Sequence, residues 1–390
     1  MTWTSRCARA VAVVGALLIL GVGVSSADET GGWVTGDLHV HTTYSGDVWD
    51  PVNDDEESEP FTLGHSVEQQ FLQASTRGLD FLAITDHNDI RAHSDPGFAT
   101  HGVLGMYGYE NSLRGHAQML GARSIYEAGD ESAAAVTTMA DLLRTDGGLF
   151  QINHPAAGSV AWPDDPDWRY GYDVVPDAVE VWNIQSVWQP PAFSSNSIDD
   201  AIRYWEGWLN QGARIPATGG SDNHWLLTNS AQGVGQPTTW IYASELSEPA
   251  ILAGIRAGRT FITWQPPALH PPQVYLEADA DGDGVYEAMV GDNVPVGSAF
   301  RARVIDAPPG SHVAAYTSDG FEGLTPVLLD AVPLAVAPEA RWVRVEVVIP
   351  AEEAAPALLA ACDEQLGTQT TYCRNRLVRV SMSSPIYVDA

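Results

Sequence analysis

Histidines and carboxylates recur between residues 37 and 224 in short motifs whose spacing suits metal binding. The first motif is Asp37-Leu38-His39-Val40-His41, in which His39 and His41 would project from the same side of a strand. Two imidazole nitrogens placed in this way can bind one divalent ion. A His-x-His pair also occurs without a metal, so this motif needs support from others.

Further motifs place the same residue types at the ends of apolar runs. They are Thr85-Asp86-His87-Asn88-Asp89, Glu110 followed by His116, Asn153-His154-Pro155, and Gly219-Gly220-Ser221-Asp222-Asn223-His224. Pro155 is expected to hold His154 extended, and the paired glycines would let the backbone approach a ligand. Each residue alone has an ordinary structural interpretation, but their number at strand ends favours a metal centre. Nitrogen and oxygen ligands together favour zinc, manganese or iron over calcium.

Apolar runs rich in β-branched residues alternate with helical segments from Trp33 to about Gln265. The runs are Trp33–His39, Asp80–Thr85, Val103–Tyr109, Ala117–Ala122, Leu149–Ile152, Ala178–Trp182 and Ile215–Gly219, and helical spacing appears in Val67–Thr76, Val136–Arg144, Ile198–Gln211 and Pro249–Ala257. This alternation predicts an α/β fold with a parallel sheet, and the number of runs predicts a barrel. Active sites lie at the C-terminal ends of barrel strands, where these motifs fall.

The sequence changes character after Pro266-Pro267. Short runs with period-two alternation, broken by Gly, Pro and Asp, follow at Val274–Glu277, Phe300–Val304, His312–Tyr316, Trp342–Val348 and Leu377–Met382. This pattern predicts a small all-β sandwich. We therefore expect a signal peptide over residues 1–27, an α/β barrel over 28–268 and a β-sandwich domain over 269–390.

The first 27 residues have the features of a signal peptide. A start with two arginines precedes an apolar run from Ala10 to Val24, and small residues stand before Asp28. The run is shorter than the ~20 residues of a membrane-spanning helix, which makes an uncleaved anchor the weaker alternative. We expect a mature chain that begins near Asp28, is secreted or periplasmic, and has no stable membrane insertion. In an exported chain Cys362 and Cys373 could form a disulfide.

The chain is strongly acidic, with 50 acidic and 19 basic residues and a formal net charge of −31. Nucleic acids are bound by clustered positive charge, so we expect no nucleic-acid partner. There is no lysine in the sequence, which excludes Schiff-base chemistry by a lysine amine. The acidity would also slow the approach of polyanionic substrates.

The five motifs, in their order along residues 33–265, resemble those of the polymerase and histidinol phosphatase (PHP) superfamily. The Glu180-Val181-Trp182-Asn183 strand end, the Ala257-Gly258-Arg259-Thr260 segment, the signal peptide and the β-rich tail resemble its exported branch of CehA/McbA-type metallohydrolases, named for a carbaryl hydrolase. The resemblance implies a distorted (β/α)7 barrel that holds two or three divalent ions, Zn, Mn or Fe.

The resemblance also implies a ligand set for each ion. The first ion would take His39, His41, Glu110 and Asp222, the second Glu110, His116 and His154, and the third His87, His224 and Asp47. The family usually has Ser-Asp-Gly at the last position, whereas this chain reads Ser45-Gly46-Asp47, so Asp47 is displaced by one residue. The acidic insertion from Asp50 to Glu59 follows. A solvated loop is its preferred interpretation, and the alternative is that it reshapes the third site or supplies a substitute ligand.

The activity implied by the resemblance is that of a hydrolase, in which a hydroxide held between two ions attacks a phosphate ester. The catalytic residues expected on this basis are Glu110, Asp222, His224 and Asp86. Arg91 and Arg114 are candidates to clamp an anionic small-molecule substrate, although surface charge is the preferred role of each. Hydrolysis of a carbamate or carboxylic ester is the alternative within enzymes.

Two non-enzymatic alternatives stay open from the sequence. The chain could bind metal without catalysis, or it could be a calcium-stabilised surface module. The second is suggested by Asp279-Ala280-Asp281-Gly282-Asp283-Gly284, which resembles the start of an EF-hand loop. Val290 stands where such a loop needs a bidentate glutamate, so a β-turn is the preferred interpretation. The substrate and the oligomeric state are not determined by the sequence.

Overall fold

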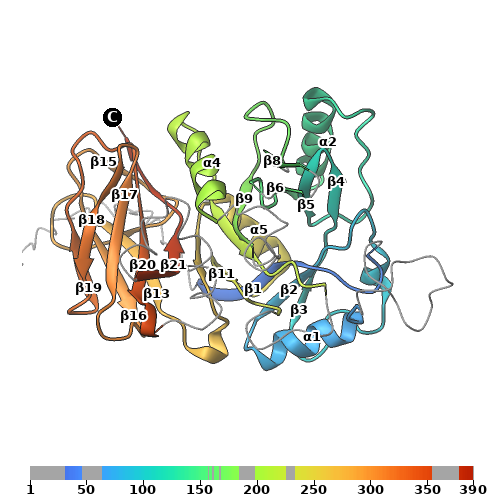
Figure 1. The fold of residues 1–390 in the computed structure, drawn as a ribbon, viewed down its shortest axis with the longest axis horizontal. Coiled ribbons are helices and arrows are strands. Elements are labelled where there is room, and N and C mark those ends of the chain that lie inside the picture. The colour runs from blue at the N-terminus through green and yellow to red at the C-terminus, as the bar shows by residue number, and fades with distance from the viewer. Residues whose placement is uncertain are drawn as a thin grey trace, which may run out of the picture. The chain divides into compact units, whose positions relative to one another are not determined.

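The computed structural model describes residues 31–45, 64–156, 158–159, 162–166, 168–183, 198–224, 233–353 and 377–389 (Figure 1). Outside these residues lie the expected signal peptide, Asp47, the acidic insertion, and the cysteine pair Cys362 and Cys373. Within the described ranges, no helix is both long enough and apolar enough to cross a membrane.

One sheet is built around the strand that carries the first motif. β1 (Gly32–Val40) pairs in parallel with β2 (Phe81–Ile84), and β2 pairs in parallel with β3 (Leu104–Met106). On its other side β1 pairs antiparallel with β11 (Thr238–Ala243), which pairs with β12 (Thr260–Thr263). The second half of β1 is buried on both faces, so its polar side chains lie inside the protein.

A second sheet carries the later motifs. β10 (Ala217–Gly220), β9 (Ala178–Asn183) and β6 (Leu149–Ile152) are parallel neighbours, and β5 (Gly115–Leu120) and β4 (Glu110–Leu113) complete the sheet. The sequence predicted a parallel sheet, but β5 pairs antiparallel with both β6 and β4. Gly115, whose φ of 125° suits glycine, lies where the chain reverses between β4 and β5 to form a hairpin. β7 (Gly158–Ser159) and β8 (Trp162–Pro166) form a separate short pair.

Two isolated bridges connect these sheets at the ends that carry the motifs. Val40 at the end of β1 pairs with Asn223, and His87 pairs with Glu110. Motifs far apart in the sequence are brought together in this way. The mixed α/β fold rich in strands is confirmed, while closure of the seven runs into a PHP-type barrel stays a prediction.

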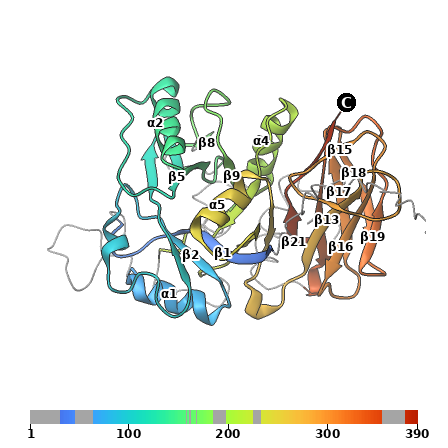
Figure 2. The ribbon, with the colours of Figure 1, turned by 180° about the vertical axis from the view of Figure 1, so that it is seen from behind.

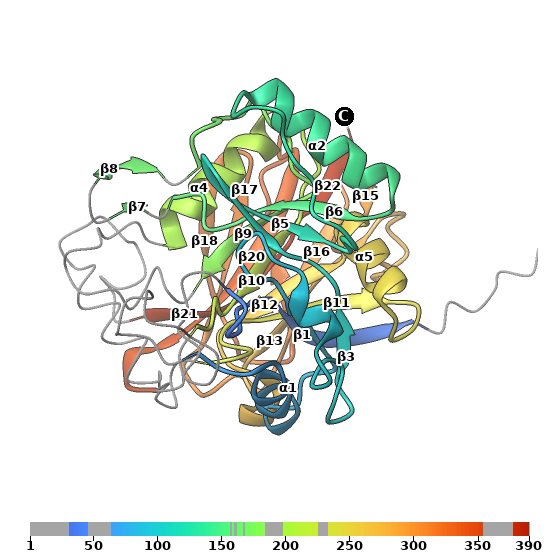
Figure 3. The same cartoon turned by 90° about the vertical axis from the view of Figure 1, so that its right-hand side faces the viewer.

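Helices pack against the strands of both sheets. α1 (Val67–Thr76) contacts β2, α2 (Ala133–Thr145) contacts β6, α4 (Ile198–Asn210) contacts β9, and α5 (Glu248–Arg256) contacts β11. Figures 2 and 3 show these helices around the strands. Ser66, Ser132 and Ser247 each accept a hydrogen bond from a backbone N–H of the first turn, which explains where α1, α2 and α5 begin. Short 3-10 helices span Arg91–Ser94, Pro267–Leu269 and Ala351–Glu353.

After α5 the described part of the chain consists mostly of strands. β13 (Gln273–Asp279), β14 (Ala288–Met289), β16 (Ala299–Ile305) and β19 (Ala331–Leu334) form a four-stranded sheet. The first sheet also includes β15 (Asn293–Pro295), β17 (His312–Thr317), β18 (Gly320–Pro326), β20 (Trp342–Pro350), β21 (Leu377–Ser383) and β22 (Ile386–Asp389). It does so because β21 pairs antiparallel with β12. This sheet therefore includes strands from both sides of residue 268. Gly31–Ala390 form one compact unit. The domain boundary at residue 268 and the β-sandwich stay predictions.

The Asp279–Gly284 segment connects β13 to β14 as a turn. Both carboxylate oxygens of Asp279 accept backbone N–H groups, from Gly282 at 2.7 Å and Gly284 at 2.9 Å. Asp279, Asp281 and Glu287 also present oxygens within 4.8 Å of one another. The hydrogen bonds account for the motif as a turn, and calcium binding there stays an alternative prediction.

Candidate metal centre

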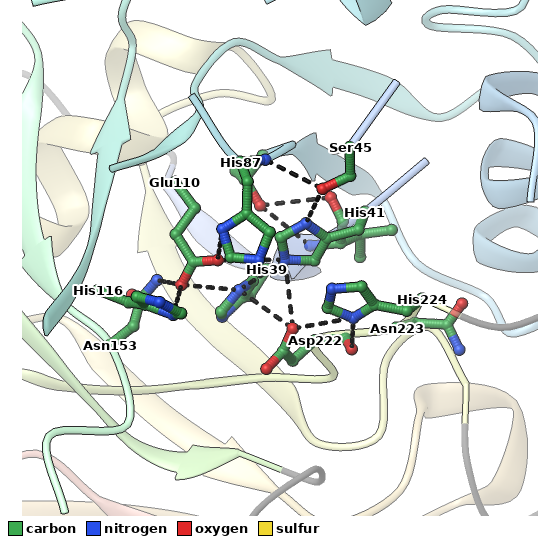
Figure 4. A network of polar contacts seen from close by, with 12 residues as sticks. His39, His41, Ser45, His87, Glu110, His116, Asn153, Asp222, Asn223 and His224 are labelled. Carbon is green, nitrogen blue, oxygen red and sulfur yellow. Dashed lines mark hydrogen bonds and ion pairs between the residues drawn. The ribbon is translucent and has the colours of Figure 1, made fainter. Parts of the chain in front are cut away.

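Side chains from the motifs converge where β1, β4 and β10 meet. Figure 4 shows His39, His41, Glu110 and Asp222 directed toward one another. His39 and His41 come from the end of β1, and Asp222 follows β10. The backbone N–H of Asp222 donates to the carbonyl of His39 at 2.8 Å, so strand pairing itself places the carboxylate beside the histidines.

These four side chains form a compact set of metal-ligand atoms. Nε2 of His39 and Nε2 of His41 lie 3.0 Å apart. Glu110 presents one oxygen 3.3 Å from His39 and the other 3.3 Å from His41, and Oδ1 of Asp222 lies 3.4 Å and 3.2 Å from the same nitrogens. Ligands held tetrahedrally at about 2.0–2.1 Å from a zinc ion are about 3.3 Å apart. The spacing therefore suits one ion bound by His39, His41 and Glu110, whose ligand atoms lie within 4.8 Å of one another, and it places an oxygen of Asp222 beside both histidine nitrogens.

Glu110 also contacts the remaining histidines of the cluster. Its Oε1 lies 3.3 Å from Nδ1 of His116 and 3.4 Å from Nε2 of His154, and its Oε2 lies 3.2 Å from Nδ1 of His87. Glu110 thus belongs to the first set and also contacts a second group of donors, as expected of a carboxylate shared by two ions.

A third group of donors lies beside the first. The rings of His41 and His224 are stacked with centroids 3.9 Å apart, and ligand nitrogens of His41, His87 and His224 lie within 4.8 Å of one another. His87 and His224 were predicted to hold the third ion with Asp47. Because Asp47 lies outside the described residues, the third ligand set stays a prediction.

Burial and charge at the centre favour cation binding. Burial lowers the pKa of His41 to about 4, with a further contribution from His224, so its ring is neutral and has a lone pair to donate. Burial alone would also lower the pKa of His39, but the Asp222, Glu110 and Glu180 carboxylates raise it well above its usual value. These three carboxylates therefore favour the protonated form of His39 when no metal is bound.

The pKa values of the two carboxylates shift in the opposite direction from that of His39. Burial would raise the pKa of Glu110 and of Asp222, yet the neighbouring histidines, His39 foremost, lower both below their usual range. Oε2 of Glu110 is buried without a hydrogen-bond donor in the described part of the chain. Ionised, buried carboxylate oxygens beside imidazole nitrogens form a donor set that suits a divalent transition metal, so the residues fit such an ion.

Hydrogen bonds behind the donor atoms fix their orientation. Asn153 donates to Oε1 of Glu110 at 2.7 Å, and Oγ of Ser45 lies 3.0 Å from Nδ1 of His41 and accepts the backbone N–H of His87 at 3.1 Å. No role was predicted from the sequence for Ser45 or Asn153. Asn153 stands beside a motif histidine, which was the available signal; the Ser45 contact depends on how the loop folds back.

His154 differs from its predicted conformation. The following proline was expected to keep it extended, but its φ is 26°, in the left-handed region. Asp222 also has a positive φ, of 52°. Non-glycine residues in this region cost conformational energy and often occur at functional sites. At His154 this backbone accompanies a ring placed 3.4 Å from Glu110.

Asp86 supports the loop that follows His41. Its two oxygens accept the backbone N–H of Thr42 at 2.5 Å and the Thr42 hydroxyl at 2.7 Å. Burial raises the pKa of Asp86 to about 7. Asp37 also binds the backbone, since it accepts hydrogen bonds from the backbone N–H groups of Ser221 and Gly235. These contacts suit positioning of the backbone, and they do not test the catalytic role predicted for Asp86.

The two predicted substrate-binding arginines pair with surface carboxylates. Arg91, whose side chain is 69% exposed, lies 2.6 Å from Asp89, and Arg114, 52% exposed, lies 3.8 Å from Glu131. Both contacts direct these guanidinium groups toward surface carboxylates rather than toward the donor cluster. Their role toward substrate stays a prediction.

Comparisons with known proteins give structural likenesses alone. No protein-family model matches the chain, and no curated protein matches it by sequence. A two-domain protein from Bacteroides vulgatus that contains a predicted PHP-like metal-dependent phosphoesterase is 15% identical, with a TM-score of 0.44, over 83% of this chain and 91% of that one.

Two further solved structures are similar over about half of this chain. A putative metal-dependent phosphoesterase from Bifidobacterium adolescentis is 12% identical, with a TM-score of 0.32, over 51% of this chain and 90% of that one. An amidohydrolase from Chromobacterium violaceum, with bound sulfate and no metal, is 15% identical, with a TM-score of 0.30, over 49% and 88%. Likenesses at these values do not establish a shared reaction, so the functional argument rests on the site itself.

Proposed function

We propose that this protein is an exported metallohydrolase of the PHP superfamily, of CehA/McbA type, and that it hydrolyses phosphate esters. One observation carries the proposal. The Nε2 atoms of His39 and His41 lie 3.0 Å apart, Glu110 and Asp222 each present an oxygen within 3.4 Å of both, and Glu110 also meets His116 and His154. A shared carboxylate between two donor groups is typical of hydrolases that use a pair of ions.

Divalent ions bound there would lower the pKa of water and polarise the ester. The chain's own part is to hold the donors and exclude solvent from one side. His39 and His41 are fully buried, whereas the side chain of His116 is 30% exposed and that of His87 16% exposed. The open side of the centre therefore lies toward His116 and His87, and we expect the ester to approach from there. Glu110 and Asp222 supply the negative charge that neutralises the ions.

A carbamate or carboxylic ester is the second candidate substrate. The observation that favours it is the pairing of Arg91 with Asp89 and of Arg114 with Glu131, which leaves these guanidinium groups engaged with protein carboxylates. A neutral ester needs no cationic clamp, and the net charge of −31 does not oppose its approach.

The test is a substrate panel measured with and without metal. Purified protein would be stripped with a chelator, reloaded separately with Zn²⁺, Mn²⁺ or Fe²⁺, and assayed on p-nitrophenyl phosphate, bis-p-nitrophenyl phosphate, p-nitrophenyl acetate and a naphthyl methylcarbamate. We expect activity on a phosphate ester that is lost on stripping and returns on reloading. Activity confined to the carbamate or acetate would favour the second candidate, and no metal-dependent hydrolysis at all would contradict both.

A further inference from the structure

Glu180 lies behind His39, away from the donor atoms of the candidate centre. It stands in β9, within Ala178-Val179-Glu180-Val181-Trp182, a strand whose residues are all buried. Its Oε1 is 3.0 Å from Nδ1 of His39, and neither side chain is exposed. A carboxylate in an otherwise apolar buried strand is strongly unfavourable unless a partner compensates for the lost water. His39 is that partner.

The contact determines which nitrogen of His39 carries a proton. Nε2 of His39 faces Nε2 of His41 at 3.0 Å and Glu110 at 3.3 Å, so it is the nitrogen directed at the candidate metal site. Nδ1 faces the Glu180 carboxylate, which can only accept. A neutral His39 must therefore keep its proton on Nδ1, and its Nε2 lone pair is left for a metal.

Asn183 connects the same carboxylate to a second donor. Its Nδ2 lies 2.9 Å from Oε2 of Glu180 and 3.2 Å from Oδ2 of Asp222. Oδ1 of Asp222 is the atom that faces His39 and His41. One amide thus holds Glu180 and Asp222 in fixed orientations without adding charge.

Gly220 on β10 leaves the space that the Glu180–His39 contact needs, which is independent support for this contact. A Cβ placed on Gly220 would lie 2.3 Å from Oε1 of Glu180 and 2.5 Å from Cβ of His39. Any side chain at 220 would therefore push Glu180 and His39 out of place. The glycines of this motif were expected to let the backbone approach a ligand; Gly220 instead makes room for the pair behind the ligand.

We propose that Glu180 is a positioning residue that fixes the tautomer and ring orientation of His39, with Asn183 aligning Glu180 and Asp222 beside it. The inference deepens the proposed function and rests on it only in requiring that the centre binds metal. Partners of this kind behind a metal-binding histidine commonly change metal affinity by about 10–100-fold when they are removed.

The test measures Zn²⁺ affinity directly, by competition with a chromogenic chelator on metal-stripped full-length protein. The variants are Glu180→Gln, Glu180→Ala and Asn183→Ala. We expect Glu180→Ala to weaken Zn²⁺ binding by about 10–100-fold, Glu180→Gln to fall between it and the parental protein because the amide oxygen still accepts, and Asn183→Ala to lose less. Glu346→Gln is the matched control, because Glu346 is equally buried but pairs with Arg344 on β20.

A spectroscopic measurement on the zinc-loaded protein adds a second readout, because a zinc ion on Nε2 of His39 leaves Nδ1 as the only ring nitrogen that can carry a proton. With ¹⁵N-labelled histidine, the Nδ1–H proton of His39 should be visible in the parental protein, where Glu180 accepts it, and lost to exchange in Glu180→Ala. Parental Zn²⁺ affinity in Glu180→Gln, or an equal loss in Glu346→Gln, would overturn the inference. A parental protein that binds Zn²⁺ but hydrolyses no ester would instead overturn the proposed function and leave this inference standing.

Discussion

Glu110 contacts donors on both sides of the candidate centre. Its two oxygens lie within 3.4 Å of ring nitrogens from His39, His41, His116 and His154. Each histidine, by contrast, offers a metal one nitrogen. Loss of the Glu110 charge would leave two cations facing each other with less neutralisation at short separation.

We therefore expect Glu110→Gln to lose at least one equivalent of bound metal and to reduce kcat/KM by about 100-fold or more, since it removes metal-bound water activation. His224→Ala should cost less, because His224 belongs to the third donor group. Metal content, circular dichroism and hydrolysis rates would be measured on both variants. Full metal occupancy with near-parental turnover in a folded Glu110→Gln protein would contradict the shared-ligand assignment.

Asp86 makes a separate prediction, about stability. Asp86→Ala leaves the buried N–H and hydroxyl of Thr42 without their acceptors, which should lower the free energy of unfolding by about 1–3 kcal/mol. Asp86→Asn keeps an oxygen for the Thr42 N–H and should cost less. Urea unfolding of both variants would check the order. Equal stability of Asp86→Ala and the parental protein would show that these hydrogen bonds do not hold the loop.

At the scale of elements, local signals in the sequence located most helices and several strands. The predicted helix over Val67–Thr76 has the same bounds in the structure, because apolar spacing and the Ser66 cap coincide there. β11 and β12 were not among the predicted runs, although Thr238–Ala243 is rich in β-branched and aromatic residues. Their pairing with β1 and β21 joins distant parts of the chain and has no local signature.

In the candidate site, too, residues with a local sequence signal were predicted, whereas contacts between distant parts of the chain were not. Histidines and carboxylates in motifs were predicted because two-residue spacing on a strand is readable from sequence. Glu180 was quoted as part of a strand end but given no role, although a lone charge within an apolar run is itself a signal that a partner exists. Its partner His39 is 141 positions away, and only the arrangement of β9 beside β10, and of β10 beside β1, reveals it.

The β12–β21 pairing predicts that the α/β part depends on the C-terminal strands. β12 residues Phe261–Thr263 pair with Ser381–Ser383, and the hydroxyl of Ser384 accepts the N–H of Ala217 at 2.9 Å. Ending the chain at residue 268 would expose this sheet edge and its buried apolar neighbours. We expect such a truncated protein to aggregate in gel filtration. A soluble, monomeric and thermally cooperative truncated protein would contradict this dependence.

At the scale of the whole molecule, the net charge of −31 should influence which substrates reach the centre. Repulsion of an anionic ester is screened by salt, because the Debye length falls from about 10 Å at 0.1 M to about 3 Å at 1 M. We expect KM for p-nitrophenyl phosphate to fall as NaCl rises from low concentration, and KM for neutral p-nitrophenyl acetate to change little. The same slope for both esters would mean that the global charge has no part in substrate selection.

The central claim is that His39, His41, Glu110 and Asp222 together bind a metal ion. Anomalous diffraction from crystals of zinc-loaded protein, recorded on both sides of the zinc absorption edge, tests it most directly. The account predicts a zinc peak within about 2.0–2.2 Å of ligand atoms from all four side chains. A zinc-loaded crystal with no peak at these four residues, or with its peaks only elsewhere on the protein, would contradict it.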